Sequence, residues 1–527
     1  MTITLSRFKA MKQTVIPDSR EYWTGKVFFM ATMWITIGVY IAGLIAVGVV
    51  TGRSSKSIAD LTVGGRQAGA WLSALSYGTA YFSAVMFVGY AGATGFGFGL
   101  WGILAGLGNA VFGSLLAWML LARRTREAAA RLNLHTMPEF FEKAYNSKAM
   151  KLFACLVIFI FLVPYSASVY KGLGSIAQVL LGINDTVFMV IIAALAALLL
   201  IFGGYLVQAR ADFVQGIIMM GGVALLIFFI VRADAVGGLQ GIAEYAKTPQ
   251  GLPKLDGKGW WALLSLVLMT SFGTWGLPHM LQKYFGIRDD KQAKRGIWIS
   301  TFFALLVAGG GYFIGSLCHA FVKAGQINVE SLQAAHGAVF KDYIVPSMLK
   351  AANIPGVLLG IVFVLLLAAS VSTLCSVTLT ASSTLVMDFI GTLRPKTPEK
   401  QLKLGTKLLC VLFIVVSYAV ANSNTPILDL MSYSWGIISG SFMAPYVLSL
   451  YYKGMNKIGA WSGIGVGFAI ALIPAVSKLL NLAGVTAQAA ADLMGQGPQF
   501  AVVAMAASLA VCFIVSATTR RLSKEAR

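Results

Sequence analysis

Long runs of apolar residues alternate with short polar or basic segments along the whole chain. Three of these runs, 27–50, 296–318 and 356–387, contain no charged residue. Each is long enough to cross about 30 Å of hydrocarbon as a helix, because an α-helix rises about 1.5 Å per residue. The pattern therefore predicts an all-α polytopic membrane protein.

Thirteen apolar runs meet this requirement and predict about 13 transmembrane helices. We expect them near 27–50, 70–93, 97–121, 150–180, 186–206, 212–231, 259–282, 296–319, 356–387, 405–422, 427–451, 457–478 and 499–519. They form a single transmembrane domain over 27–519, between an N-terminal tail, 1–26, and a C-terminal tail, 520–527. The tail 1–26 has no apolar core, so we expect no cleavable signal peptide.

The composition excludes a soluble globular protein. Hydrophobic residues make up 57% of the 527 positions and charged residues only 12%, whereas soluble domains carry about 25% charged residues. The five cysteines form no CxxC pair, and the four histidines have no metal-ligand spacing. The chain also lacks a phosphate-binding GxxxxGK[ST] loop. We therefore expect neither an enzyme, nor an organic cofactor, nor ATP as the energy source.

The net charge of +21 is a topology signal rather than a sign of nucleic-acid binding. With thirteen spans, 27 of the 41 Lys and Arg residues fall in segments on one side of the membrane, among them Lys283 in the loop after span 259–282. Cytoplasmic loops are enriched in Lys and Arg. We therefore expect a multi-pass protein of the cell membrane with its C-terminus in the cytoplasm and its N-terminus outside.

Two predicted spans lose their apolar character halfway along, at 76–83 and at 270–279. The second of these contains Pro278 and two glycines. Non-helical backbone at membrane depth survives only where it faces protein or an aqueous cavity. Interrupted helices at matching positions, here five spans apart, indicate an inverted-repeat transporter with its site at mid-membrane. Simple packing kinks are the alternative interpretation.

The span 356–387 carries a stripe of small and hydroxyl side chains. Ala369, Ser372, Thr373 and Ser376 are spaced i, i+3, i+4 and i+7, so they share one helical face. Hydroxyls and freed carbonyls can replace the water of a monovalent cation without burying another charge. A small-residue interface that lets two helices approach closely is the alternative.

Asp212 is the carboxylate best placed to act inside the membrane. It stands at the start of the predicted span 212–231, where it either reaches the site or caps the helix on the cytoplasmic side. A proton-coupled carrier would need a titratable relay at membrane depth, and Asp212 is the one carboxylate suitably placed for it.

At these residues the chain resembles the sodium:solute symporter family, which includes bacterial proline, pantothenate and acetate symporters and sodium/sugar cotransporters. The resemblance covers about 30–455. It implies five plus five helices in an inverted repeat, as in the leucine transporter, here about 70–231 and 259–451. It rests on the segments 61–66 (LTVGGR), 135–141 (HTMPEFF), 203–216 (GGYLVQARADFVQG), 273–279 (GTWGLPH) and 367–383 (LAASVSTLCSVTLTASS).

The resemblance implies the ion sites residue by residue, with Na⁺ as the only metal. The principal sodium site would use backbone carbonyls of Thr79, Phe82 and Ala369 and hydroxyls of Ser372 and Thr373. A second sodium site, present in some members, would use Asp212, Ser372 and Ser376; here Cys375 replaces a serine of some relatives.

The resemblance also narrows the choice of solute class. The sequence 276–279 is similar to the branches whose substrates carry a carboxylate, such as an amino acid, pantothenate or a short monocarboxylate. Tyr81 stands where proline symporters have an aspartate, and Thr270 and Thr274 replace an aromatic pair. We expect sodium-coupled import by alternating access; the alternative is a proton-coupled or a sugar or polyol carrier of the same fold. The expected solute contacts are Tyr81, Met86, Tyr165, Thr274, Trp275 and Trp435.

Overall fold

A computed structural model describes residues 31, 34–43, 66–202, 205–484 and 492–525. This part of the chain is almost entirely helical and contains no β-strand beyond one isolated bridge between Ala68 and Ile287. The predicted N-terminal tail, 1–26, and most of the first predicted span, 27–50, lie outside the described residues.

The helices follow one another closely, and several are joined through short 3-10 or π-helical segments. The α-helices are α4 (Ala70–Tyr81), α5 (Ala91–Phe98), α6 (Ile103–Gly108), α7 (Arg123–Leu132), α8 (Met137–Tyr145), α9 (Lys148–Leu181), α10 (Asp185–Phe202), α11 (Tyr205–Arg232), α12 (Gly238–Ala246), α13 (Gly257–Phe272), α14 (Pro278–Phe285), α15 (Asp290–Ala304), α16 (Gly310–Ser316), α17 (Cys318–Lys323), α18 (Val329–His336), α19 (Ile344–Ala351), α20 (Gly356–Ser383), α21 (Gly391–Leu393), α22 (Glu399–Ala421), α23 (Ile427–Met431), α24 (Ile437–Tyr451), α25 (Lys457–Leu482) and α27 (Gly497–Glu525). The π-helical segments are η2 (Val85–Tyr90), η4 (Asn109–Leu116), η5 (Trp118–Ala122), η7 (Leu305–Gly309), η9 (Thr384–Ile390) and η10 (Ser432–Gly436), and the 3-10 segments are η3 (Gly99–Gly102), η6 (Gly273–Trp275) and η8 (Gly337–Tyr343).

Within the described residues, eight helices are long and apolar enough to cross a membrane. A ninth candidate is the pair Gly257–Trp275 and Pro278–Phe285, which is bent by 44°. Shorter apolar helices, such as Asp185–Leu200, and the first predicted span account for part of the difference from thirteen. The total of thirteen spans stays a prediction.

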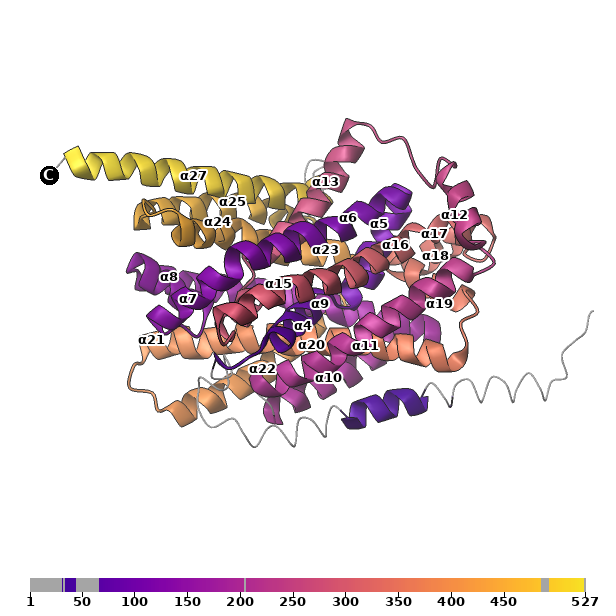
Figure 1. The fold of residues 1–527 in the computed structure, drawn as a ribbon, viewed down its shortest axis with the longest axis horizontal. Coiled ribbons are helices and arrows are strands. Elements are labelled where there is room, and N and C mark those ends of the chain that lie inside the picture. Colours follow the sequence, from indigo (N-terminus) through magenta and orange to yellow (C-terminus); the bar gives the residue numbers. More distant parts are fainter. Residues whose placement is uncertain (1–30, 32–33, 44–65, 203–204, 485–491, 526–527) are drawn as a thin grey trace, which may run out of the picture.

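The long helices run roughly side by side along the horizontal direction of Figure 1. Helix α20 lies at the centre and packs against α4, α9, α11 and α22. Helices α24, α25 and α27 pack together on one flank, where α27 also contacts α13. Helices α7, α8 and α21 lie at one end of the bundle, and α12, α17 and α18 lie at the other.

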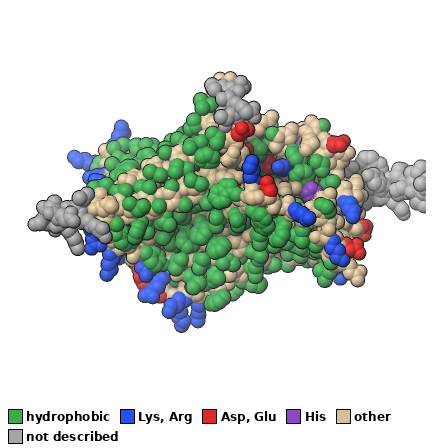
Figure 2. Space-filling view, turned by 90° about the horizontal axis from the view of Figure 1, so that it is seen from above, with side chains coloured by type: hydrophobic (Ala, Val, Ile, Leu, Met, Phe, Trp, Pro, Cys, Tyr) green, Lys and Arg blue, Asp and Glu red, His purple; other side chains and the backbone are tan. Residues whose placement is uncertain are grey.

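Hydrophobic and charged side chains are distributed over the surface as in a membrane protein. Hydrophobic side chains form a broad band across the face in Figure 2, and Lys and Arg gather mainly toward its two ends. Large apolar side chains are exposed on the long helices; Leu408 of α22, for example, is 63% exposed. Such a surface is stable only in a hydrocarbon environment.

Two segments predicted as polar loops or tails are helical. Arg123, Arg124, Arg126 and Arg131 belong to α7, and α27 continues through most of the predicted tail 520–527 as far as Glu525. Arg, Ala, Leu and Glu are strong helix formers, and no Gly or Pro interrupts either segment. Apolar length therefore underestimated how far these helices extend beyond the membrane.

Asp342 is a buried carboxylate outside the predicted spans. It belongs to η8 and lines a cavity of about 440 Å³ together with Lys171, Asp185 and His336. Its Oδ2 accepts a hydrogen bond of 3.1 Å from the backbone N–H of Ile427, at the start of α23. Burial raises the pKa of Asp342 to about 7, and the Ile427 N–H and the Lys171 charge offset part of that rise.

This raised pKa predicts a pH dependence of stability. In the folded chain Asp342 keeps its proton up to about pH 7, whereas in the unfolded chain it loses this proton near pH 3.8. The proton therefore stabilises the folded chain. This stabilisation is fully present below pH 4 and is lost as the pH rises to 7. Asp342→Asn removes this contribution. Between pH 5 and 7 the wild type should lose on the order of 2 kcal/mol relative to the variant. Thermal unfolding of both proteins in detergent, as a function of pH, measures this loss of stability. Tm values of the two proteins that change in parallel with pH would refute the prediction.

Candidate functional site

The break in α4 creates the first half of the site. Helix α4 ends at Tyr81, and Phe82 has an extended backbone with φ −110° and ψ 114° before the chain turns into η2. Side chains of neighbouring helices bind the backbone groups that the break releases. Tyr165 of α9 donates to the carbonyl of Ala80 at 3.2 Å, and the N–H of Ala84 donates to Ser370 Oγ of α20 at 3.0 Å.

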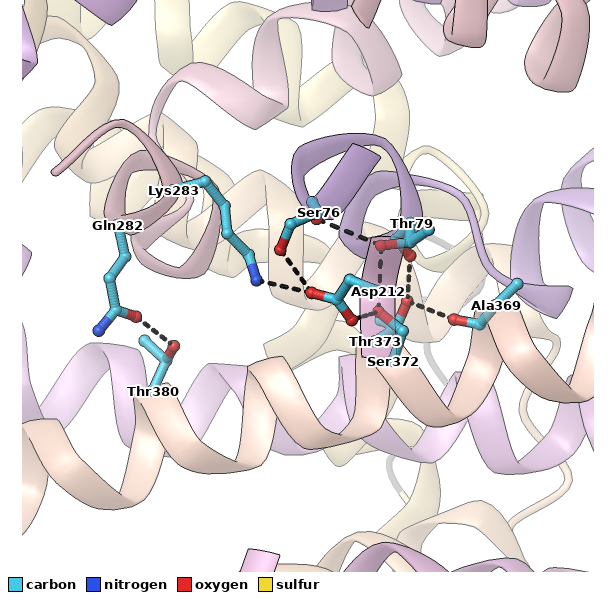
Figure 3. A network of polar contacts seen from close by, with 9 residues as sticks. All are labelled: Ser76, Thr79, Asp212, Gln282, Lys283, Ala369, Ser372, Thr373 and Thr380. Carbon is cyan, nitrogen blue, oxygen red and sulfur yellow. Dashed lines mark hydrogen bonds and ion pairs between the residues drawn. The ribbon is translucent and has the colours of Figure 1, made fainter. Parts of the chain in front are cut away.

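The hydroxyl face of α20 lies directly against this break. Thr373 Oγ1 is 3.2 Å from the carbonyl oxygen of Thr79 and 3.0 Å from that of Ala369 (Figure 3). Ser372 Oγ is 3.2 Å from Thr79 Oγ1. All of these groups are buried. The structure thus places Thr79, Ala369, Ser372 and Thr373 together, with Phe82 three residues beyond Thr79 in the extended segment.

Asp212 lies beside this cluster and is fully buried. Its Oδ1 accepts a hydrogen bond of 2.6 Å from Ser372 Oγ, and its Oδ2 accepts one of 2.5 Å from Ser76 Oγ. Helix α11 begins at Tyr205, seven residues before Asp212, so this carboxylate is not a helix cap. The alternative capping role proposed from the sequence is therefore wrong, because the helix starts earlier than the apolar pattern indicates.

Lys283 is the most important residue that sequence reasoning misplaced. The distribution of basic residues predicts Lys283 in a cytoplasmic loop, but the residue belongs to α14 and is buried. Its Nζ lies 3.2 Å from Asp212 Oδ2 (Figure 3). The exposed fractions of the two side chains are 3% and 0%. One signal could have found this ion pair: a carboxylate at membrane depth needs a partner.

Helix α14, the second half of the other broken span, is also bonded to α20. Gln282, next to Lys283, accepts a hydrogen bond of 3.0 Å from Thr380 Oγ1 through its Oε1. Ser376, proposed for the second sodium site, is buried on α20 one turn from Ser372. Cys375 between them is also buried.

A small cavity of about 20 Å³ lies beside the α4 break and is lined in part by Phe82 and Ser83. Three of the six expected solute contacts line it, namely Tyr81, Met86 and Trp435. Tyr165 does not line it, but its ring packs edge-on against Trp435 with centroids 5.6 Å apart. The cavity is smaller than any organic solute, so these side chains must move apart to admit one.

Thr274 and Trp275 are held elsewhere and do not line this cavity. Thr274 Oγ1 donates to the carbonyl of Ser271 at 2.9 Å, and Trp275 Nε1 donates to that of Phe112 at 3.0 Å. Both residues sit in the 3-10 turn η6, which follows the end of α13. Sequence spacing predicts that this turn exists but not which way its side chains point.

Sequence reasoning missed two polar groups near the cavity. Asn109 lines it and its Oδ1 accepts hydrogen bonds from Thr270 and Ser271 at 2.9 and 3.2 Å. His279 is buried beside Tyr165, and neither of its ring nitrogens has a hydrogen-bond partner among the described residues. Trp435 Nε1 is likewise buried without a partner there.

Comparison with known proteins places this geometry in context. A model of the sodium:solute symporter family matches residues 61–467. The osmoregulated proline transporter OpuE of Bacillus subtilis is 29% identical over 458 residues, covering 86% of this chain and 90% of that protein. A sodium/proline symporter of Staphylococcus aureus is 26% identical over 452 residues, with 84% and 85% covered.

Solved structures share the fold. A Na⁺-coupled sialic acid symporter in a substrate-bound outward-open state superposes with a TM-score of 0.73 at 17% identity, covering 92% of this chain and 97% of that one. The nucleobase-cation-symport-1 family transporter MHP1 gives 0.54 at 14% identity, with 87% and 95% covered. The predicted all-α polytopic fold of the leucine-transporter type is confirmed.

The family model covers most of the chain, and its relatives are transporters rather than enzymes. The resemblance noted from the sequence motifs is therefore confirmed. This multi-pass membrane protein belongs to the sodium:solute symporter family.

Proposed function

We propose that this chain couples the influx of Na⁺ to the import of a small, carboxylate-bearing organic solute by alternating access. One observation carries the proposal: near the broken end of α4, the Thr373 hydroxyl bonds to the Thr79 carbonyl, and the Ser372 hydroxyl lies 3.2 Å from Thr79 Oγ1. This arrangement brings oxygen atoms of a broken helix and of a continuous helix together.

The oxygens at this junction suit a sodium ion. Na⁺ would bind the carbonyls of Thr79, Phe82 and Ala369 and the hydroxyls of Ser372 and Thr373, taking the place of the hydrogen bonds that now join α4 to α20. Sodium shifts the conformational equilibrium only through a difference in affinity between states. Bound here, it would favour the state in which the two helices are held together.

The energy available from one sodium ion is sufficient for concentrative uptake. One charge moving through about 100 mV releases about 2.3 kcal/mol, and a tenfold sodium gradient adds roughly 1.4 kcal/mol. Their sum supports a solute gradient of several hundredfold. A single coupled Na⁺ therefore accounts for secondary active transport.

The solute would bind in the small cavity beside the α4 break, which we call the solute cavity. The absence of charged side chains from its described lining favours a zwitterion. Its described lining, which includes Tyr81, Met86, Asn109, Thr270 and Trp435, contains no charged side chain. Burying a net charge there would be costly, whereas a zwitterionic amino acid is neutral overall. Such a solute can also bind Trp435 Nε1, which has no hydrogen-bond partner among the described residues. The relatives named as proline transporters make proline the first solute to test.

We propose further that the end carrying α7 and α8 faces the cytoplasm. The segment 123–131 at this end contains four arginines, in agreement with the enrichment of Lys and Arg on the cytoplasmic side. The solute would then be imported from the end that carries α12 and α18.

The test is uptake of labelled proline into proteoliposomes with Na⁺ or choline outside at equal ionic strength. We expect uptake above the equilibrium level only with Na⁺. A panel of unlabelled amino acids, monocarboxylates and sugars, added as competitors, identifies the solute if proline itself is not carried. Equal uptake of the competing solute in Na⁺ and choline would refute sodium coupling, and uptake that follows a pH gradient instead would indicate a proton-coupled carrier.

A further inference from the structure

The region expected to hold a second sodium ion contains a cation supplied by the chain. Of its three proposed ligands, Asp212 and Ser372 are hydrogen-bonded to each other, and Ser376 lies one turn further along α20. The ammonium of Lys283 reaches the same carboxylate from α14 at 3.2 Å (Figure 3). The carboxylate is therefore already neutralised within the protein.

The coordination of Asp212 is complete without an external ion. Oδ1 accepts from Ser372, and Oδ2 accepts from both Ser76 and Lys283. These donors come from three different helices, α4, α14 and α20. A sodium ion here would have to displace at least one of these donors, and it would stand next to a second positive charge in a site closed to water.

We propose that Lys283 is a tethered cation that takes the place of the second sodium ion, so that the chain binds and transports one Na⁺ per solute. The inference rests on the proposed sodium coupling and adds its stoichiometry. Asp212 then serves as a fixed structural partner of α14 rather than as an ion ligand that empties in each cycle.

Two features of the residues around Asp212 support the role of Lys283 as a tethered cation. Cys375, which lies on α20 between Ser372 and Ser376, offers a thiol where sodium prefers oxygen. Lys283 and Gln282 both bind from α14, to Asp212 and Thr380 respectively, so the ammonium is anchored by its own helix. A permanent ion pair, unlike a bound sodium, keeps the same charge at every sodium concentration.

Lys283→Gln tests the inference, because it removes the ammonium and leaves the Asp212 carboxylate with an amide oxygen beside it. In proteoliposomes we expect the Hill coefficient of sodium-dependent uptake to rise from about one to about two. The ratio of ²²Na⁺ flux to solute flux should double. Lys283→Arg keeps the charge and should keep both values at one.

A double variant shows whether the second sodium ion of the Lys283→Gln variant depends on the Asp212 carboxylate. Asp212→Asn with Lys283→Gln has neither charge, so it should bind a single Na⁺, as the wild type does. If Lys283→Gln shows a coefficient of one and a flux ratio of one, the inference is overturned.

The wild type gives an independent answer that does not depend on any variant folding. Equilibrium binding of ²²Na⁺ to the purified protein should saturate at one ion per chain, and saturation at two would overturn the inference. No sodium binding and no sodium-dependent uptake would instead refute the proposed function, so the two failures are distinguishable.

Discussion

Asp212→Asn is expected to abolish uptake and to lower the thermal stability of the protein strongly. The substitution leaves the Lys283 ammonium, 3% exposed, without a carboxylate inside the membrane. Breaking one partner of a buried ion pair costs about 3–5 kcal/mol, because the remaining charge is uncompensated. Three hydrogen bonds to the carboxylate, from Ser76, Ser372 and Lys283, weaken at the same time.

Thermal unfolding in detergent and uptake in proteoliposomes measure the two effects. The double variant Asp212→Asn with Lys283→Gln contains no unpaired charge and should recover most of the lost stability. Asp234→Asn removes an exposed carboxylate and serves as the matched control, which should behave as the wild type does. A single Asp212→Asn variant with wild-type stability would show that the ion pair does not form in the membrane.

Ser372→Ala combined with Thr373→Ala is expected to raise the sodium concentration for half-maximal uptake by about a hundredfold. Each hydroxyl would contribute roughly 1.5 kcal/mol to ion binding, which corresponds to about tenfold in affinity. Thr373 is the cleaner of the two positions, since its hydroxyl bonds to the carbonyls of Thr79 and Ala369 and not to Asp212.

Sodium titrations of solute uptake measure this shift. Thr373→Ser retains the hydroxyl and should stay close to the wild type, whereas Thr373→Ala alone should show about a tenfold increase. At saturating sodium the solute affinity should change little, because neither side chain lines the solute cavity. An unchanged sodium dependence in the double variant would refute the assignment of this site.

Helical periodicity explains which parts of the site could be predicted. The spacing of Ala369, Ser372 and Thr373 places them on one face of a helix, and the interruption at 76–83 predicts the break that the structure shows at Phe82. Both are local properties of the sequence. They led to the same cluster of oxygens that the structure places between α4 and α20.

The partner of Asp212 could not be predicted in this way. Lys283 lies 71 positions further along the chain, and its contact depends on how α14 turns after the 44° bend. A lysine just after an apolar run has the same local pattern whether it enters a loop or is buried. The orientation of Thr274 and Trp275 was unpredictable for a similar reason, since the 3-10 turn η6 sets it.

Movements of sodium and solute should be obligatorily coupled, and a simultaneous measurement of both fluxes tests this coupling. In proteoliposomes clamped at zero membrane potential, an inward gradient of the solute should drive ²²Na⁺ inward in the absence of a sodium gradient, because coupling between two ligands is reciprocal. We predict one Na⁺ per solute molecule. Solute influx that leaves ²²Na⁺ influx unchanged would show that the two movements are not coupled.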